Sequence, residues 1–251
     1  LVQGPISRYS DLSQTLYEEH VFDKKQVIFG LERILWGYFK KLVVADTILT
    51  ATTAVIGDEY YNGAWVLVGI IFYGIELYAD FTGGIDITIG IAQVFGVKVA
   101  ENFIRPYFSK NIAEYWRRWH ISLSAFFRDY VYIPLGGSRN GNARTVLSLT
   151  VVWFFTGLWH GASWNFVLWG VMLLGFILLE KFCIGNFLKE HKVLSHVYLL
   201  FVIPQTWVIF RITRLKDVGA YFSRLFPLFG AHSAISAQDV LKLLSSYWWL
   251  L

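Results

Sequence analysis

The chain has 251 residues, of which 55% are hydrophobic, 18% aromatic and only 16% charged. Soluble domains carry roughly 25% charged residues, so this composition excludes an ordinary soluble protein and is typical of a membrane protein. The formal net charge of +4 comes from basic residues scattered between apolar segments, which argues against a nucleic-acid-binding surface. A single cysteine, Cys183, excludes an internal disulfide, and the six dispersed histidines predict no metal site.

Residues 25–45 form the first segment with a clear pattern. Their apolar and charged side chains alternate at helical spacing, so they predict an amphipathic helix. Such a helix lies at a membrane interface or lines a polar cavity, with a solvent-exposed face as the alternative. The apolar face comprises Ile28, Leu31, Leu35, Tyr38 and Leu42, and the opposite face comprises Lys25, Glu32, Arg33 and Lys40.

Residues 63–79 form an apolar span that contains one acid, Glu76, and a second apolar stretch runs to residue 97. Between them lies the motif DFTGGID (80–86). Its glycines, Gly83 and Gly84, together with Gly90, permit close approach of another helix and a break in the backbone. We interpret Asp80 and Asp86 as a helix cap and a buried hydrogen-bond partner. The alternative is a paired-carboxylate acid/base site, which a spacing of six residues does not establish.

Residues 98–144 are basic and aromatic. The sequence Ser109-Lys110-Asn111 predicts the start of a helix that continues to His120, with Glu114 and Arg118 one turn apart in the favourable order. A short helix over 121–132 and a glycine-rich turn at 134–141 follow; the turn is a plain connection or an anion-binding loop. The surplus of positive charge places the segment on the cytoplasmic side, as short helices that do not span the membrane.

The central stretch, residues 145–179, contains no charged residue and is bounded by Arg144 and Glu180. It is roughly 35 residues long, whereas a single membrane-spanning helix needs about 20. We therefore predict two helical pieces that meet near His160. A break at membrane depth is tolerated only where it faces protein or a watery cavity.

His160 is the strongest functional candidate, because an ionisable residue at such a break usually has a function. The alternative is a packed histidine whose ring nitrogens contact backbone and a neighbour. Gly157, Gly161 and Asn165 favour function, since they supply backbone freedom and an amide that a purely apolar span does not need.

The remainder predicts a charged connection over 180–192 and a further span over 193–210, which carries Pro204. Basic residues after that span indicate a second cytoplasmic end. The chain begins without a methionine or signal peptide, and residues 247–251 resemble the start of another span. We expect one membrane-embedded domain over 1–251, as a fragment with spans missing at both ends.

Three segments together resemble the membrane-bound O-acyltransferase (MBOAT) family. They are ENFIRPY (101–107); YWRRWHISLS (115–124) with RDY (128–130) and IPLGG (133–137); and GLWHGASWNF (157–166). The IPLGG loop is most similar to the bacterial branch of alginate and peptidoglycan O-acetyltransferases, and the teichoic-acid D-alanylating branch usually lacks it. The family often has Asp-Phe-Ser-Gly-Tyr-Ser-Asp where this chain has residues 80–86, so the resemblance there extends to the two aspartates and not to the aromatic and hydroxyl side chains between them.

The resemblance implies an all-α, polytopic integral membrane protein with broken and re-entrant helices around a central channel. It implies that His160 is the hallmark histidine, deep in that channel, and that His120 is a second histidine on the cytoplasmic side. We expect His160 to act as general base and His120 to position the donor or its thioester carbonyl. Substrate-binding residues are expected in the same segments: Trp116, Arg117, Arg118, Trp159 and Asn165.

The resemblance also implies the reaction. Acetyl-CoA would be the acyl donor from the cytoplasm, no cofactor would remain bound, and the acceptor would be a hydroxyl of a cell-surface or secreted polysaccharide. A separate extracytoplasmic esterase-like protein would be a partner, and the location would be the bacterial inner membrane. Basic residues at the cytoplasmic rim either attract the phosphates of coenzyme A or only set topology: Lys110, Arg117, Arg118 and Arg139.

Three rival interpretations remain. One is transfer of D-alanyl or another acyl group to a cell-wall polymer. Another is a transporter or flippase, since transporters also build sites from broken helices, although no internal repeat is evident. The last is a structural membrane subunit without chemistry, for which the break at His160 would have no use.

Overall fold

The structure is a computed structural model, and it describes residues 4–57, 64–225 and 245. These residues form helices and connections, with no strand among them. Within them, three helices are long and apolar enough to cross a membrane: Trp65–Val94, Trp164–Glu190 and Lys192–Arg211. The predicted all-α membrane protein is therefore confirmed. The span predicted to begin near residue 247 lies outside the described residues.

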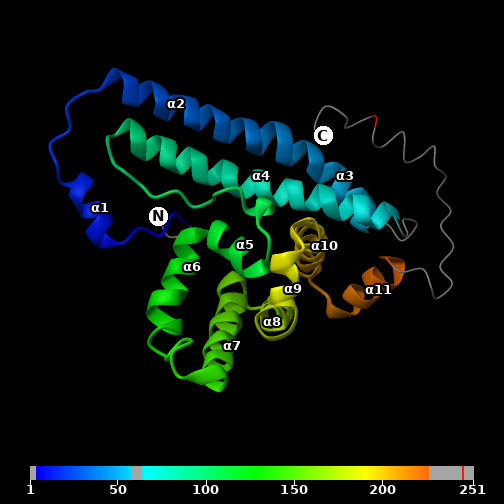
Figure 1. Ribbon diagram of the computed structural model, residues 1–251. Helices are drawn as coiled ribbons and strands as arrows, with labels where there is room; N and C mark the ends of the chain where they lie inside the picture. The colour runs from blue at the N-terminus through cyan, green and yellow to red at the C-terminus, as the bar shows by residue number, and fades with distance from the viewer. Residues whose placement is uncertain (1–3, 58–63, 226–244, 246–251) are drawn as a thin grey trace.

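A long antiparallel helix pair forms one side of the molecule (Figure 1). Its first member runs without interruption through α2 (Lys24–Tyr38), the π-helical η1 (Phe39–Ala45) and α3 (Asp46–Gly57). Its second member is α4 (Ala64–Val94). Asp23 caps α2, because its carboxylate accepts hydrogen bonds from the backbone N–H groups of Lys25 and Gln26.

Facing glycines set the separation of this pair. A Cβ on Gly37 would lie 2.6 Å from the carbonyl oxygen of Gly83, and a Cβ on Gly30 would lie 2.8 Å from that of Gly90. The reciprocal approaches are equally short, so each crossing point is glycine against glycine. Small residues let helices of membrane proteins approach until their backbones touch. The predicted close approach is confirmed for Gly83 and Gly90 and is wrong for Gly84, where nothing lies within 4 Å of an added Cβ.

The predicted backbone break in 80–86 is wrong, because α4 continues through it as a single helix. Asp80 is also no helix cap, since it lies in the middle of α4. The carboxylates of the motif form ion pairs with lysines of the neighbouring helix: Asp86 with Lys40 and Asp80 with Lys41. These contacts leave the helical backbone of α4 intact.

The amphipathic helix at 25–45 turns Arg33 and Lys40 of its charged face inward, while Lys25 and Glu32 of the same face stay exposed. Arg33 and Lys40 pair with acids on or beyond α4, whereas Leu35 is 68% exposed and Leu42 57% exposed. A soluble protein would show the opposite arrangement. An outward apolar face with inward charges suits a hydrocarbon environment.

The second half of the chain packs below this pair. In Figure 1, α8 (Trp164–Leu179) and α10 (Lys192–Arg211) are seen nearly end-on, while α4 lies across the view. The other helices of this half lie around them: α7 (Gly141–His160), α5 (Ile112–Arg118), α6 (Ile121–Phe127) and α11 (Leu215–Leu225). Helix α1 (Tyr9–Leu16) lies apart from them, where the backbone N–H of Lys98, just after α4, donates to Oγ1 of Thr15 at 3.1 Å (Figure 1). Short helical turns connect them: η2 (Pro106–Phe108), η3 (Arg128–Tyr132), η4 (Glu180–Ile184) and α9 (Gly185–Glu190).

The predicted break near His160 is confirmed. Helix α7 ends at His160, α8 begins at Trp164, and the two return against each other as a hairpin. A Cβ on Gly157 would lie 2.6 Å from the carbonyl oxygen of Phe166, and one on Gly170 would lie 2.4 Å from that of Trp153. The glycines of the central stretch therefore allow both the turn and the tight hairpin.

Stacked and edge-on tryptophans form the core where α5, α7, α8 and α10 meet. Trp169 and Trp207 stack with their ring centroids 5.6 Å apart, and Trp116 meets Trp153 edge-on at 5.2 Å. Aromatic pairs in these geometries add to the free energy gained by burial. This core holds the short helix α5 against the hairpin.

Two boundaries differ from the predictions. The helix predicted to run to His120 ends at Arg118, and the residues predicted as a connection over 180–192 are mostly helical, in η4 and α9. The predicted later span is confirmed as α10, which contains Pro204. The short helices expected over 98–144 are confirmed up to residue 140, whereas residues 141–144 belong to the long helix α7. The cytoplasmic side of this segment stays a prediction.

Candidate active site

His120 and His160 line a single cavity of about 370 Å³. His160 is the last residue of α7, and His120 lies in the turn between α5 and α6. The wall between them consists mainly of aromatic and aliphatic side chains. It includes Trp116, Trp119, Leu123, Phe127, Leu149, Val152 and Trp153, with Ser124, Tyr132 and Thr156 as polar members.

His160 is oriented by a hydrogen bond within its own helix. Its Nδ1 lies 2.7 Å from the carbonyl oxygen of Thr156. A carbonyl oxygen can only accept, so Nδ1 carries the proton and Nε2 keeps a free lone pair. The ring is held edge-on to Trp169 at 5.0 Å and to Phe210 at 5.4 Å. The imidazole therefore has a defined orientation and a basic nitrogen.

His120 occupies a strained and buried position. Its backbone is left-handed, with φ 48°, and its residue is only 6% exposed. Non-glycine residues in this conformation are uncommon and often lie at functional sites. The ring packs edge-on against Phe81 at 5.0 Å, and its Nδ1 lies 3.3 Å from Nδ2 of Asn102.

Burial, and to a smaller extent the nearby His160, lower the pKa of His120 from its ordinary value of 6.5 to about 4. Desolvation disfavours the charged imidazolium, as does a second ionisable ring in the same cavity. His120 is therefore neutral near pH 7.

The predicted substrate-binding residues divide into two groups. Trp116 and Arg117 line the histidine cavity. Arg118 does not; its guanidinium forms an ion pair with Glu114 at 2.7 Å, which is the predicted one-turn pair. Trp159 is 49% exposed and packs its ring beside Phe126 and Phe127, outside the cavity lining.

Asn165 also lies outside the cavity lining. It is fully buried, and its Nδ2 donates to the backbone carbonyl of Phe210 at 3.1 Å. This contact ties the start of α8 to the end of α10. The side-chain amide of Asn165 therefore links two helices. A contact between Asn165 and substrate stays a prediction.

A second and larger cavity, of about 780 Å³, adjoins the first. The two share Ala113, Arg117, Tyr132 and Leu149 in their linings. Its wall has a surplus of positive charge, with Lys110, Arg117, Lys181, Lys189 and Lys192 against Glu114 and Glu180. Of the predicted basic rim, Lys110 and Arg117 line it, whereas Arg118 and Arg139 do not.

Three features of the site escaped the sequence analysis. The lysines after residue 180 were predicted to lie in a connection, and they line the basic cavity. Glu180 is buried, and its carboxylate accepts from the backbone N–H groups of Ile112 and Ala113 at 2.7 and 3.4 Å, which caps α5 from another helix. Asn102 lies within a recognised motif, but its contact with His120 links residues too distant for any pattern to reveal.

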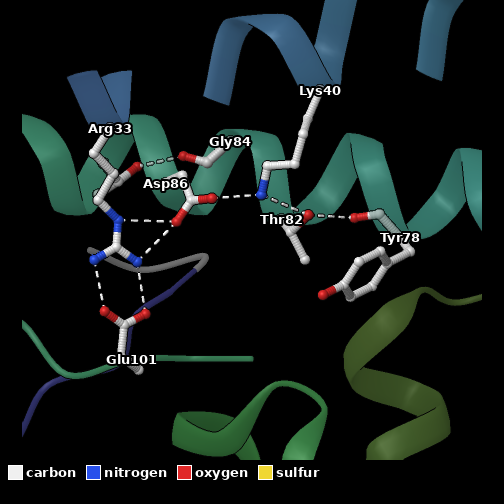
Figure 2. Close-up of polar contacts among 8 residues, drawn as sticks. Arg33, Lys40, Tyr78, Thr82, Gly84, Asp86 and Glu101 are labelled. Carbon is white, nitrogen blue, oxygen red and sulfur yellow. Dashed lines mark hydrogen bonds and ion pairs between the residues drawn. The ribbon is translucent and has the colours of Figure 1, made fainter. Parts of the chain in front are cut away.

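Asp80 and Asp86 do not form an acid/base pair. Figure 2 shows Asp86 between Arg33 and Lys40, with Arg33 also reaching Glu101. Asp80 pairs with Lys41 at 2.6 Å. Neither aspartate lines the histidine cavity or the basic cavity. The interpretation of Asp86 as a hydrogen-bond partner is confirmed, although its side chain is partly exposed rather than buried, and both carboxylates act in helix packing.

Comparison with known proteins identifies the family. The model of the membrane-bound O-acyltransferase family matches residues 1–216. The chain belongs to this family. It is 35% identical over 230 residues to the "Probable alginate O-acetylase AlgI" of Azotobacter vinelandii, covering 90% of this chain and 45% of that protein.

Other relatives carry different acceptors in their names. The chain is 34% identical to the "Peptidoglycan O-acetyltransferase" of Helicobacter pylori, with 86% of this chain and 42% of the relative covered. It is 27% identical to the "Teichoic acid D-alanyltransferase" of Bacillus subtilis, with 65% and 44% covered. The chain thus spans less than half the length of these curated relatives.

Proposed function

We propose that the protein is a membrane O-acetyltransferase that moves an acetyl group from acetyl-CoA to a hydroxyl group of a cell-surface or secreted polysaccharide. The observation that carries this proposal is the shared cavity of His120 and His160, which adjoins a basic cavity. Membership of the MBOAT family supports the reaction class.

The two cavities suit the two ends of an acyl-CoA. The phosphates of coenzyme A are anionic, and the lysines and Arg117 of the basic cavity supply positive charge. Because Arg117, Tyr132 and Leu149 belong to both linings, a donor seated there extends its thioester toward the histidines. The apolar wall of the histidine cavity limits water around the thioester, which reduces hydrolysis.

His160 supplies the base for the transfer. Its Nε2 lone pair accepts the proton of the acceptor hydroxyl as the oxygen attacks the thioester carbonyl carbon. The new C–O bond forms, the C–S bond breaks, and the proton passes from His160 to the leaving thiolate. Each atom and charge is balanced without a metal or a bound cofactor.

A polysaccharide acceptor is favoured by the relatives named for alginate and peptidoglycan. We propose the bacterial inner membrane as the location and an extracytoplasmic esterase-like protein as a partner in the final transfer. D-alanyl transfer is the second candidate, because the Bacillus subtilis relative is named for it.

The test is incorporation of labelled acyl groups by membranes that contain the intact protein. Membranes receive radiolabelled acetyl-CoA or a radiolabelled D-alanyl thioester, and base-labile label on polysaccharide is counted. The proposal expects protein-dependent incorporation from acetyl-CoA. Incorporation from the D-alanyl thioester alone would replace acetyl with D-alanyl, and incorporation from neither would contradict acyl transfer.

A further inference from the structure

The hydrogen bonds of Asn102 determine which nitrogen of His120 carries the proton. Asn102 is fully buried, and its Oδ1 accepts from the backbone N–H of Ser122 at 2.9 Å. A backbone N–H can only donate, so this contact fixes the orientation of the side-chain amide. The other end of the amide, Nδ2, therefore faces Nδ1 of His120.

The amide nitrogen of Asn102 has only donors. Nδ1 of His120 must then accept, which leaves the ring proton on Nε2. His160 shows the opposite arrangement, because its Nδ1 donates to the Thr156 carbonyl and its Nε2 is unprotonated. The two histidines of one cavity thus differ in the group left for a ligand: a lone pair on His160 and an N–H on His120.

A directed chain of hydrogen bonds supports the orientation of Asn102. The backbone N–H of Ile6 donates to Oγ of Ser122 at 3.0 Å, so the Ser122 hydroxyl proton is free to donate to Oδ1 of Asn102 at 2.9 Å. The segment that supplies Ile6 also packs on the site, since a Cβ on Gly4 would lie 2.9 Å from Nδ2 of Asn102. Successive bonds of this kind strengthen one another.

We propose that Asn102 is a positioning residue that holds His120 as the Nε2–H tautomer, so that His120 donates a hydrogen bond to the thioester carbonyl oxygen while His160 acts as the base. This inference rests on the proposed acyl transfer and assigns the two histidines different chemistry. As the acceptor oxygen attacks, negative charge grows on the carbonyl oxygen, and a fixed N–H donor stabilises it. The proton stays on His120 throughout.

Glutamine variants separate a donor from a base. A glutamine side chain offers an N–H near the position of a histidine Nε2 but has no basic nitrogen. His120→Gln should keep acetyl transfer within about 10-fold of wild type, whereas His120→Ala should lower kcat by about 10²–10³, the loss typical of a missing oxyanion donor. His160→Gln should be as inactive as His160→Ala. Equal losses in His120→Gln and His120→Ala would overturn the donor role.

The tautomer itself is measured by nitrogen NMR on the intact protein in lipid nanodiscs, with ¹⁵N-labelled histidine and His120→Gln to assign the His120 signals. We expect an unprotonated Nδ1 and a protonated Nε2 at pH 7. Asn102→Asp presents a carboxylate oxygen to Nδ1, so Nδ1 should become protonated, and kcat should fall while the KM for acetyl-CoA is unchanged. Asn142→Asp, the same change at an exposed site on α7, should alter neither.

The outcomes distinguish the inference from the function on which it rests. Acetyl transfer by a wild-type protein whose His120 is protonated at Nδ1 would overturn the inference and leave the function standing. Absence of acetyl transfer, with His120 in the expected tautomer, would overturn the function alone. If the Asn102→Asp protein does not accumulate, the tautomer of His120 in the wild-type protein and the activity of His120→Gln still test the inference.

Discussion

His120 and His160 line the same cavity, although one belongs to a left-handed turn and the other ends a long helix. Two features bring them together. The break at Gly161 ends α7 at His160, and Asn102 anchors the turn that carries His120. Both features hold the segments that carry the histidines. We therefore expect substitutions in the supporting helices to lower the stability of the protein and to affect the chemistry only through it.

The facing glycines of α2 and α4 provide a first prediction. Gly83→Ala should destabilise the protein by about 1–3 kcal/mol, because its Cβ would lie 2.8 Å from the carbonyl oxygen of Gly37 and force the helices apart. Gly84→Ala is the matched control: nothing lies within 4 Å of its Cβ, and alanine favours helix by about 0.5–1 kcal/mol. Thermal unfolding in detergent measures both, and equal melting temperatures would refute this view of the packing.

The ion network of Asp86 provides a second prediction. Asp86→Asn removes the carboxylate shared by Arg33 and Lys40, which are largely shielded from solvent. Hydrogen bonds to charged groups contribute about 1.5–3 kcal/mol, so a loss of that order is expected in denaturant unfolding. Asp46→Asn is the control, because Asp46 and Lys41 are each 43% exposed and such a pair contributes about 0–1 kcal/mol. A larger effect at Asp46 would contradict the assignment.

The basic cavity provides a third prediction, on donor binding. The double variant Lys189→Gln with Lys192→Gln should raise the KM for acetyl-CoA by about 3–10-fold at low salt, since it removes two positive charges from the lining. The difference should shrink at high salt, where charges are screened. Lys216→Gln, at an exposed lysine outside both cavities, should leave the KM unchanged. An unaltered KM in the double variant would exclude the basic cavity as the donor site.

The buried state of His120 provides a fourth prediction, on pH. Its pKa is about 4 in the folded protein and about 6.5 in an unfolded chain, so between these values the unfolded chain binds more protons. Stability should therefore fall as the pH drops from about 6.5 to 4. Arg117, Arg128 and His160 line the same cavity, and no carboxylate does so within the described part of the chain, so no neighbour there favours the imidazolium.

The measurement is the melting temperature in detergent between pH 4 and 7. As the pH falls over this interval, the melting temperature of the wild-type protein should decrease more than that of His120→Gln, since glutamine does not titrate. Parallel losses in the two proteins would show that His120 does not contribute.

Much of the architecture follows from the sequence alone. The length of the uncharged stretch 145–179, with its glycines, predicts a broken helix at His160, because a bilayer sets the length of a span. Local spacing also predicts the Glu114–Arg118 pair. These features depend on residues close in the chain.

Features that depend on distant residues could not be predicted in the same way. The motif at 80–86 suggested a backbone break, since a glycine pair is compatible with a break or with close packing; the choice is made by Gly37 and Lys40 in another helix. Lys181, Lys189 and Lys192 line one cavity with Lys110, which is distant in the chain, and Glu180 joins the two segments by capping α5. The contact of Asn102 with His120 likewise requires the fold to close first.

The central claim is that His160 is the base for acyl transfer, and one measurement tests it most directly. Acetyl transfer from radiolabelled acetyl-CoA is compared between membranes with wild-type protein and with His160→Gln at equal abundance, while acetyl-CoA binding is measured in parallel. Loss of a general base should lower transfer by about 10²–10⁴-fold and leave donor binding intact. Near-normal transfer by His160→Gln would contradict the claim and make His160 a packed residue of the helix break.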